Sequence, residues 1–505
     1  MTANPKNLFA LMGPLVAILV TILLLGIDNN YLLNLVIWVM VWWMALMLLV
    51  YRARYLNLGV VFWMLPSTWL MIGPVLQIYI PVLLYGFGWN TLPNAAEPGS
   101  INQAIAYWTV ITAFIVLGAA IFEPYRALRS ALDRVSLGIL VGRLTTPKIA
   151  RAAAIMLIFA IVARLSQGGI AIHEIQIAAR VLGESAAVNT RVTMFILPLM
   201  ILSTSLAAFR FVIAMKDGRI PVSVHVLFWC SLFTSTGYQI LLGSRGGVLS
   251  SVFPSVLIIT LLLNGSQRRR MLMIMGFLFV AFMLIADFTR SLTVAILAGN
   301  SPSSFSFFGL ANALFDGFQS SNDVSQNAGD GTIATFFRRI GTGWILSNLM
   351  AHPESFPILN PGSFLRVYTV AFPSILSPWN AFIPYPTEHG IFDLGYIMGE
   401  IITGITGVGT AVPPQAEIYW RFGWLLGPAA AMIWGASIAL LLRFWSRFSP
   451  ELGLFLALFF SIQISLSETS WVLIANLVRN PILLMLALYA ARARIKRVGP
   501  SLRAR

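Results

Sequence analysis

The amino-acid sequence predicts an all-α, polytopic integral membrane protein with about twelve transmembrane helices and one large, late loop on the outer face. Three observations predict this fold class. Of the 505 residues, 58% are hydrophobic and only 10% are charged, whereas a soluble domain carries about 25% charged residues. The mean hydropathy is +0.83. Apolar runs of about 20 residues, long enough to cross a hydrocarbon core as a helix, recur along the chain.

Twelve apolar runs define the predicted spans. They fall at 8–26, 31–51, 58–82, 103–122, 150–166, 192–214, 223–242, 247–264, 271–289, 424–443, 451–467 and 471–490. No small-residue cleavage site follows the first run, so we expect it to be a retained helix rather than a signal peptide.

The basic residues predict the orientation of these spans. With the N-terminus in the cytoplasm, the inside segments hold 23 of the 33 Lys and Arg residues, and 14 of the 18 acidic residues lie elsewhere. This is the positive-inside pattern, and we expect a multi-pass inner-membrane protein with both termini cytoplasmic. The net charge of +15 then reflects short basic clusters that meet anionic lipid, so no nucleic-acid partner is expected.

This topology divides the chain into four regions. Residues 1–289 would hold nine transmembrane helices, with an outer loop near 167–191. Residues 290–423 would form the large periplasmic loop, residues 424–490 would add three helices, and residues 491–505 would form a basic cytoplasmic tail.

The large loop has internal patterns of its own. Residues 332–350 predict an amphipathic helix at the membrane surface. Residues 391–412 are apolar but broken by five glycines, which favours a re-entrant or half-buried element over a further span. In PPQAEIYWRFGWLLG (413–427), two prolines begin a helix that places Glu417 and Arg421 on one face, at positions i and i+4.

Ten arginines lie outside the predicted cytoplasmic segments, where lipid charge does not explain them. Arg245 stands in GSRGG, directly before a predicted helix, where backbone N–H groups favour an anion. Arg479 lies inside a span, at a cost of at least about 2.5–3.5 kcal/mol, and should face the bundle interior. The arginines that we take as candidates for binding a phosphate or pyrophosphate are Arg191, Arg245, Arg290, Arg366, Arg421 and Arg479. Snorkelling to lipid phosphate and structural ion pairs are the alternatives.

Metal and disulfide chemistry are not expected. Cys230 is the single cysteine, and the four histidines lie on separate segments without the spacing of a metal site. Among them, His389 in PYPTEHG stands beside the expected cavity of the large loop. Tyr419 and its aromatic neighbours are able to stack on sugar faces or to form an interfacial belt.

These motifs resemble the Wzy-type polymerases of O-antigen and related oligosaccharide repeat units, which belong to one superfamily with the O-antigen ligases. The resemblance covers roughly 230–445. It rests on GSRGG at 243–247 opening a span, the large late periplasmic loop, and PPQAEIYWRFGWLLG at 413–427 leading into the next span.

The resemblance implies a glycosyltransferase with a GT-C-like membrane fold that uses neither a metal nor another cofactor. The donor would be a glycan on undecaprenyl pyrophosphate and the acceptor a hydroxyl of the next lipid-linked repeat unit. Arg245 would hold the pyrophosphate, helped by Arg366 or Arg421. Chemistry also demands a base for the acceptor hydroxyl, for which Glu417 and His389 are the candidates and Glu388 is a third. A chain-length regulator protein is an expected partner, beside the phospholipid bilayer.

Two other functions compete with this interpretation. An O-antigen ligase would transfer the glycan to lipid A core, and His389 would suit its acceptor site. A transporter or flippase of lipid-linked sugars would show repeat symmetry and polar residues in several spans. The sequence shows neither feature, and its polar residues gather in the outer loop.

Overall fold

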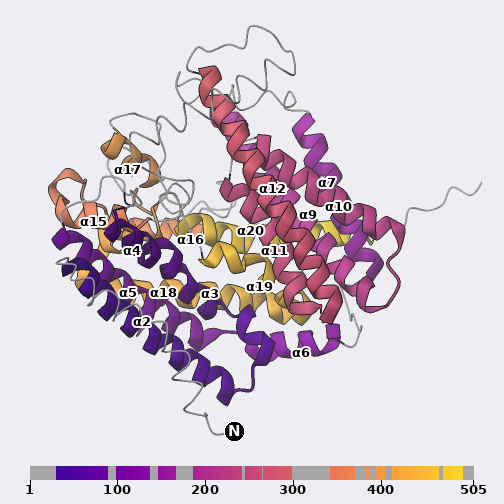
Figure 1. Ribbon diagram of the computed structural model, residues 1–505, viewed down its shortest axis with the longest axis horizontal. Helices are drawn as coiled ribbons and strands as arrows, with labels where there is room; N and C mark the ends of the chain where they lie inside the picture. The colour runs from indigo at the N-terminus through magenta and orange to yellow at the C-terminus, as the bar shows by residue number, and fades with distance from the viewer. Residues whose placement is uncertain are drawn as a thin grey trace, which may run out of the picture. The chain divides into compact units, whose positions relative to one another are not determined.

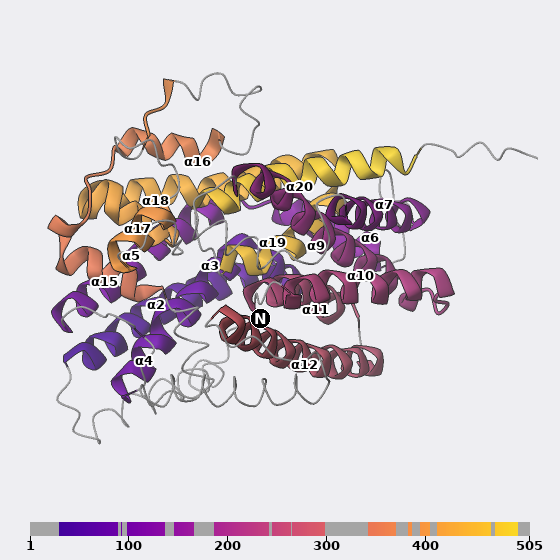
Figure 2. The ribbon, with the colours of Figure 1, turned by 90° about the horizontal axis from the view of Figure 1, so that it is seen from above.

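The computed structural model contains only helices as regular elements among the residues that it describes. Those residues are 30–88, 92, 98–136, 146–165, 186–241, 245–263, 265–297, 342–369, 382–385, 394–403, 412–465 and 470–492. Figures 1 and 2 show these helices in two views at right angles.

Six helical stretches in the described part are long and apolar enough to cross a membrane. They are Asn34–Tyr55, Pro66–Gly86, Gly99–Phe122, Ile196–Lys216, Pro414–Phe448 and Val472–Ala490. The stretches Gly247–Leu262 and Pro450–Ser465 are apolar but shorter. A chain with several such helices is a multi-pass membrane protein.

Eleven of the twelve predicted runs coincide with helices, and the first run, 8–26, lies outside the described residues. Ten of these runs are single helices: α2 (Asn30–Tyr55), α5 (Pro98–Phe122), α7 (Thr146–Leu165), α9 (Ala186–Lys216), α10 (Val222–Leu241), α11 (Arg245–Leu262), α12 (Gly265–Leu297), α18 (Pro414–Phe448), α19 (Pro450–Ser465) and α20 (Ser470–Ala490). The run at 58–82 is composite. It contains a 3-10 helix (Gly59–Met64), α3 (Pro66–Pro74), a π-helical turn (Val75–Tyr79) and α4 (Ile80–Gly86).

The structure describes three segments of the large loop, and at one of them a helix begins earlier than predicted. The tenth span begins ten residues earlier than 424, because the helix that starts at Pro414 continues through to Phe448. Within 391–412, the described part is one helix, α17 (Leu394–Thr403). Of the surface helix expected at 332–350, residues 332–341 lie outside the described part and the rest forms α15 (Gly343–Ala351).

The chain divides into two compact units. Unit 1 contains Met1–Arg129, Ser291–Phe444 and Phe460–Leu477, and unit 2 contains Ser130–Arg290, Trp445–Phe459 and Val478–Arg505. Within unit 1, α2, α5 and α18 run alongside one another in both views (Figures 1 and 2). Trp108 and Tyr107 of α5 are fully buried in its core.

Close contact between α5 and α18 depends on glycine. A Cβ atom on Gly435 would overlap the carbonyl of Ile115, and one on Gly118 would overlap the carbonyl of Met432. Glycines at such points let two membrane helices approach until their backbones touch, which strengthens the dispersion contacts that hold them together.

At the opposite end of α2 and α5 from the large loop, a buried carboxylate joins three segments of unit 1. Glu123 accepts a hydrogen bond from Arg52 at 2.9 Å and one from the backbone N–H of Ser67 at 2.7 Å. Arg52 also donates to the carbonyl of Ala120 at 2.7 Å. The Glu123 side chain is fully inaccessible to solvent, whereas that of Arg52 is 27% exposed.

Unit 2 is built around α9, which contacts α7, α10 and α11. Small hydroxyl side chains lie at these contacts: Ser203 donates to the carbonyl of Ala153 at 2.8 Å, and Thr204 donates to the carbonyl of Ser231 at 2.9 Å. Ser235 of α10 bonds Ser251 of α11 at 3.0 Å. Such polar pairs are typical of helix interfaces in membranes.

Candidate functional site

The first turn of α18 positions the two charged residues of the 413–427 motif. Pro414 is the first helical residue, where its missing N–H costs nothing. The carbonyl of Pro413 accepts the backbone N–H of Glu417 at 3.0 Å, so the helical bonds start at once. Glu417 lies in the first turn, where the helix dipole favours a carboxylate.

Glu417 and Arg421 form an ion pair, as the i, i+4 spacing predicts. The Nη2 atom of Arg421 lies 3.0 Å from Oε1 of Glu417, and its Nε donates to the same oxygen at 3.0 Å. The side chains are only 1% (Arg421) and 5% (Glu417) exposed. Removing both charges from solvent is costly, so such a pair needs further hydrogen bonds around it.

Those further bonds come from a segment about 60 residues earlier in the chain. The Nη1 atom of Arg421 donates to the carbonyl of Asn360 at 3.3 Å and to the hydroxyl of Ser363. Both residues belong to a turn and 3-10 helix (Pro361–Leu365), which the Asn360 side chain caps by accepting the N–H of Gly362 at 2.9 Å. Arg421 therefore ties this part of the large loop to α18.

Arg366 makes a second connection within the large loop. It begins α16 (Arg366–Thr369), is 9% exposed, and donates to the carbonyls of Pro384, at 2.9 Å, and of Ile383. Its guanidinium also lies over the ring of Tyr385, 3.7 Å from the centroid, a cation–π arrangement. The segment 382–385 is held against α16 in this way.

Aromatic side chains surround the ion pair. Phe364 packs against Phe422 of α18, with ring centroids 5.4 Å apart. Trp420 donates its indole N–H to the carbonyl of Pro357 at 3.0 Å. Aromatic side chains thus add contacts between the loop segment 353–369 and α18.

Tyr419 lies on the side of α18 that meets α5. Its ring contacts Tyr107 edge to face, with centroids 5.0 Å apart, and Tyr107 donates to the carbonyl of Gly423 at 3.0 Å. Gly423 has φ 58° and ψ −154°, a conformation that essentially only glycine adopts. This break in α18 makes the carbonyl of Gly423 available to Tyr107. Tyr419 itself remains partly accessible.

Tyr368 lies within electrostatic range of the same carboxylate. Its OH lies 3.3 Å from Oγ of Ser437. Burial raises the pKa of Tyr368 above its ordinary value; the contact with Ser437 opposes this shift, and the charge of Glu417 adds to it. The phenol therefore stays protonated at neutral pH beside Glu417.

The predicted site residues divide between the two units. Arg366, Glu417, Tyr419 and Arg421 belong to unit 1. Glu417 and Arg421 share one buried network with the large loop, and Arg366 makes a separate connection to the segment 382–385. His389 lies outside the described residues. The remaining four are in helices of unit 2: Arg191 in α9, Arg245 at the first position of α11, Arg290 in α12 and Arg479 in α20.

The structure adds four residues to the predicted set. Asn360 and Ser363 bind Arg421, and Tyr107 and Tyr368 lie beside Tyr419 and Glu417. Only the NPGS turn at 360–363 carried a sequence signal, since Asn, Pro and Gly predict a tight turn. Among the described residues, no group of three or more His, Cys, Asp or Glu side chains is arranged to hold a metal ion.

Comparison with known proteins adds no relative. The chain matches no protein-family model, no curated protein and no solved structure.

Proposed function

We propose that this protein is a membrane glycosyltransferase that polymerises lipid-linked oligosaccharide repeat units at the periplasmic face of the inner membrane. The observation that carries the proposal is the buried network of the 413–427 motif. The motif that resembles the Wzy-type polymerases begins α18, and its Glu417 and Arg421 are joined to the large loop through Asn360 and Ser363. Burying this charged pair costs free energy, which supports a role for the pair beyond packing.

The proposed reaction is a glycosyl transfer from undecaprenyl pyrophosphate. The acceptor hydroxyl oxygen forms a bond to the anomeric carbon of the growing glycan, and the bond from that carbon to the pyrophosphate oxygen breaks. The pyrophosphate leaves on its lipid, and a base takes the proton of the acceptor hydroxyl. Guanidinium groups stabilise the charge that develops on the leaving group.

Glu417 is the candidate base within the described residues, and His389 is the other candidate. The two contacts between Arg421 and Glu417 both use Oε1. Oε2 takes part in neither contact, and in the proposal it accepts the proton. The neighbouring Tyr368, kept protonated by burial, is a hydrogen-bond donor to the acceptor sugar or to the base.

The experiment that tests the proposal is a gene deletion followed by analysis of the surface glycan. Loss of the proposed polymerase leaves single repeat units attached to the lipid A core. A ligase deletion would instead leave the core without any unit, and a flippase deletion would strand the units on the cytoplasmic side. An unchanged polymer would refute all three functions.

Arg245 provides a second test, because the resemblance assigns it the pyrophosphate. We expect Arg245→Ala to abolish chain extension while the protein still inserts into the membrane. Arg54 is an exposed arginine on the predicted inner side, and we expect Arg54→Ala to leave chain extension unchanged. The sidedness is checked with Arg245→Cys and an impermeant maleimide, after Cys230→Ser removes the native exposed thiol. Labelling of position 245 from the cytoplasm only would contradict the proposal.

A further inference from the structure

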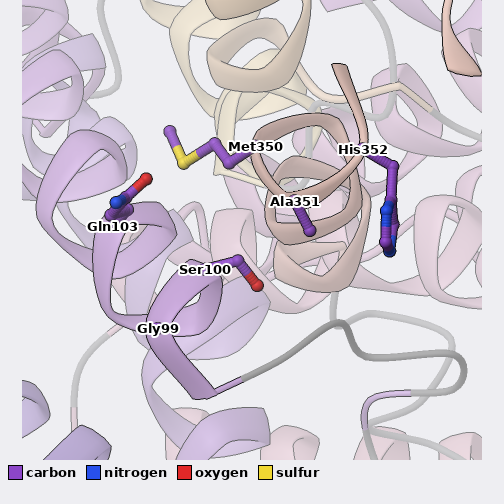
Figure 3. Close-up of a pocket in the computed structure, with 6 residues that line it drawn as sticks. All are labelled: Gly99, Ser100, Gln103, Met350, Ala351 and His352. Carbon is purple, nitrogen blue, oxygen red and sulfur yellow. The ribbon is translucent and has the colours of Figure 1, made fainter. Parts of the chain in front are cut away.

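A small polar cavity lies in unit 1 between the first turn of α5 and the end of α15. Its volume is about 260 Å³, and its lining consists of Gly99, Ser100, Gln103, Met350, Ala351 and His352. Figure 3 shows Ser100 and Gln103 on α5, Met350 and Ala351 on α15, and His352 directly after α15. None of these residues belongs to the network of Glu417 and Arg421.

The lining favours a neutral ligand rich in hydroxyl groups. Ser100 and Gln103 each offer both a hydrogen-bond donor and an acceptor, and the imidazole of His352 adds a further polar group; a sugar hydroxyl needs both a donor and an acceptor. Among the described residues that line the cavity there is no lysine or arginine, so this lining does not suit a pyrophosphate, which binds best to guanidinium or ammonium groups. Met350 adds an apolar surface for the C–H face of a sugar ring.

The size of the cavity favours one ring over a chain. At about 30 Å³ for each water, 260 Å³ corresponds to about nine waters, and pockets for larger organic ligands start near 300 Å³. A single pyranose fits this range. A whole repeat unit would have to extend out of the recess.

The cavity is connected to the 413–427 motif along one face of α5. Gln103 and Tyr107 are four residues apart, one helical turn or about 6 Å along the axis, and Ser100 lies on the same face. Tyr107 contacts Tyr419 of α18 edge to face, with ring centroids 5.0 Å apart. A sugar ring held by Gln103 therefore lies about one helical turn from Tyr107, which contacts Tyr419 of the 413–427 motif.

We infer that this cavity is a saccharide subsite that binds one sugar ring of the lipid-linked repeat unit. The inference rests on the proposed function for the identity of the glycan, but the binding of a free sugar is tested without any transfer reaction. Gln103 and His352 are the residues expected to determine which sugar is accepted, because they carry the exposed polar groups of the lining.

The test is saturation-transfer NMR on the purified full-length protein in detergent. The probes are glucose, galactose, N-acetylglucosamine and, as a phospholipid headgroup mimic, glycerol phosphate. We expect transfer to at least one of the sugars. Gln103→Leu should weaken this binding by about two- to tenfold, the effect of one lost hydrogen bond, and Ala351→Phe, which fills the recess, should abolish it.

The matched control is Gln267→Leu, the same exchange at an exposed glutamine of α12 that does not line the cavity; it should bind sugar like the parent protein. The inference is overturned if no sugar binds, if only glycerol phosphate binds, or if both cavity variants bind as the parent does. A deletion strain that keeps its polymer refutes the proposed function instead. If the deletion strain loses its polymer but both cavity variants bind sugar normally, the proposed function stands and only the subsite is refuted.

Discussion

Inside unit 1, Arg421 neutralises Glu417, which lies one helical turn earlier on α18; the guanidinium is 3.0 Å from the carboxylate. The Nη1 atom of Arg421 also donates hydrogen bonds to Asn360 and Ser363 of the large loop. The same guanidinium therefore compensates a buried charge and fixes the loop to the membrane helix. Structural and catalytic roles of this pair are separable, because they respond differently to single and double substitutions.

Removal of one partner should be costly, because the other remains buried and charged. We expect Arg421→Met to lower the free energy of unfolding by about 3–5 kcal/mol, and Glu417→Leu to have a comparable effect. The double variant Glu417→Leu/Arg421→Met replaces the pair with apolar groups and should recover much of this loss. Thermal unfolding in detergent measures the three values. Equal destabilisation in the double variant and the singles would show that the charges do not compensate each other.

The double variant also separates folding from activity. If Glu417 is the base, a well-folded double variant makes no polymer in the deletion strain. Polymer of normal length from that variant would remove Glu417 from the reaction and leave the pair a structural role only.

Arg52 should matter for stability rather than for transfer. It compensates Glu123, which is fully buried, but its own side chain is 27% exposed, so water replaces part of the lost interaction. We expect Arg52→Ala to cost about 1–3 kcal/mol. The matched control is Arg54→Ala, two residues away and exposed, which should change stability by less than about 0.5 kcal/mol. Identical melting temperatures for the two variants would argue against a stabilising role of the Arg52–Glu123 pair.

Local spacing predicted some of these relationships and missed others. The i, i+4 pair of Glu417 and Arg421 could be predicted because both residues lie on one helix that starts at two prolines. The bonds of Arg421 to Asn360 and Ser363 span 61 and 58 residues, and periodicity contains no information on which loop packs against which helix. The burial of Glu123 was not predicted either, because its partners, Arg52 and the N–H of Ser67, lie 71 and 56 residues away in the sequence.

The helices were more predictable than the site. Apolar runs mark where a chain must form helices in a membrane, and eleven of the predicted runs coincide with helices. The composite span at Pro66–Gly86 was not foreseen in detail, since Pro74 and Pro81 permit a π-helical turn between them without revealing its geometry. The assignment of Arg191, Arg245, Arg290 and Arg479 to a pyrophosphate stays a prediction.

Two kinds of buried hydroxyl in unit 2 should respond in opposite directions. Within the described residues, Thr236 and Ser255 carry buried hydroxyl oxygens with no hydrogen-bond partner, whereas Ser235 bonds Ser251 across α10 and α11 at 3.0 Å. We expect Thr236→Val and Ser255→Ala to leave stability unchanged or raise it by about 1 kcal/mol, since an unpaired buried polar group is removed. Ser235→Ala leaves Ser251 unpaired and should cost about 1 kcal/mol. Melting temperatures that fall by the same amount in all three variants would contradict this distinction.

The contact between α5 and α18 should be the least tolerant of added volume. Because a Cβ on Gly435 would overlap the backbone of Ile115, Gly435→Ala must push the two helices apart, at an expected cost of about 1–3 kcal/mol. Gly237 of α10 has no atom within 4 Å of such a Cβ, so Gly237→Ala is the matched control and should be neutral or stabilise the helix by up to about 1 kcal/mol. An unaltered melting temperature for Gly435→Ala would mean that the helices do not touch at this point.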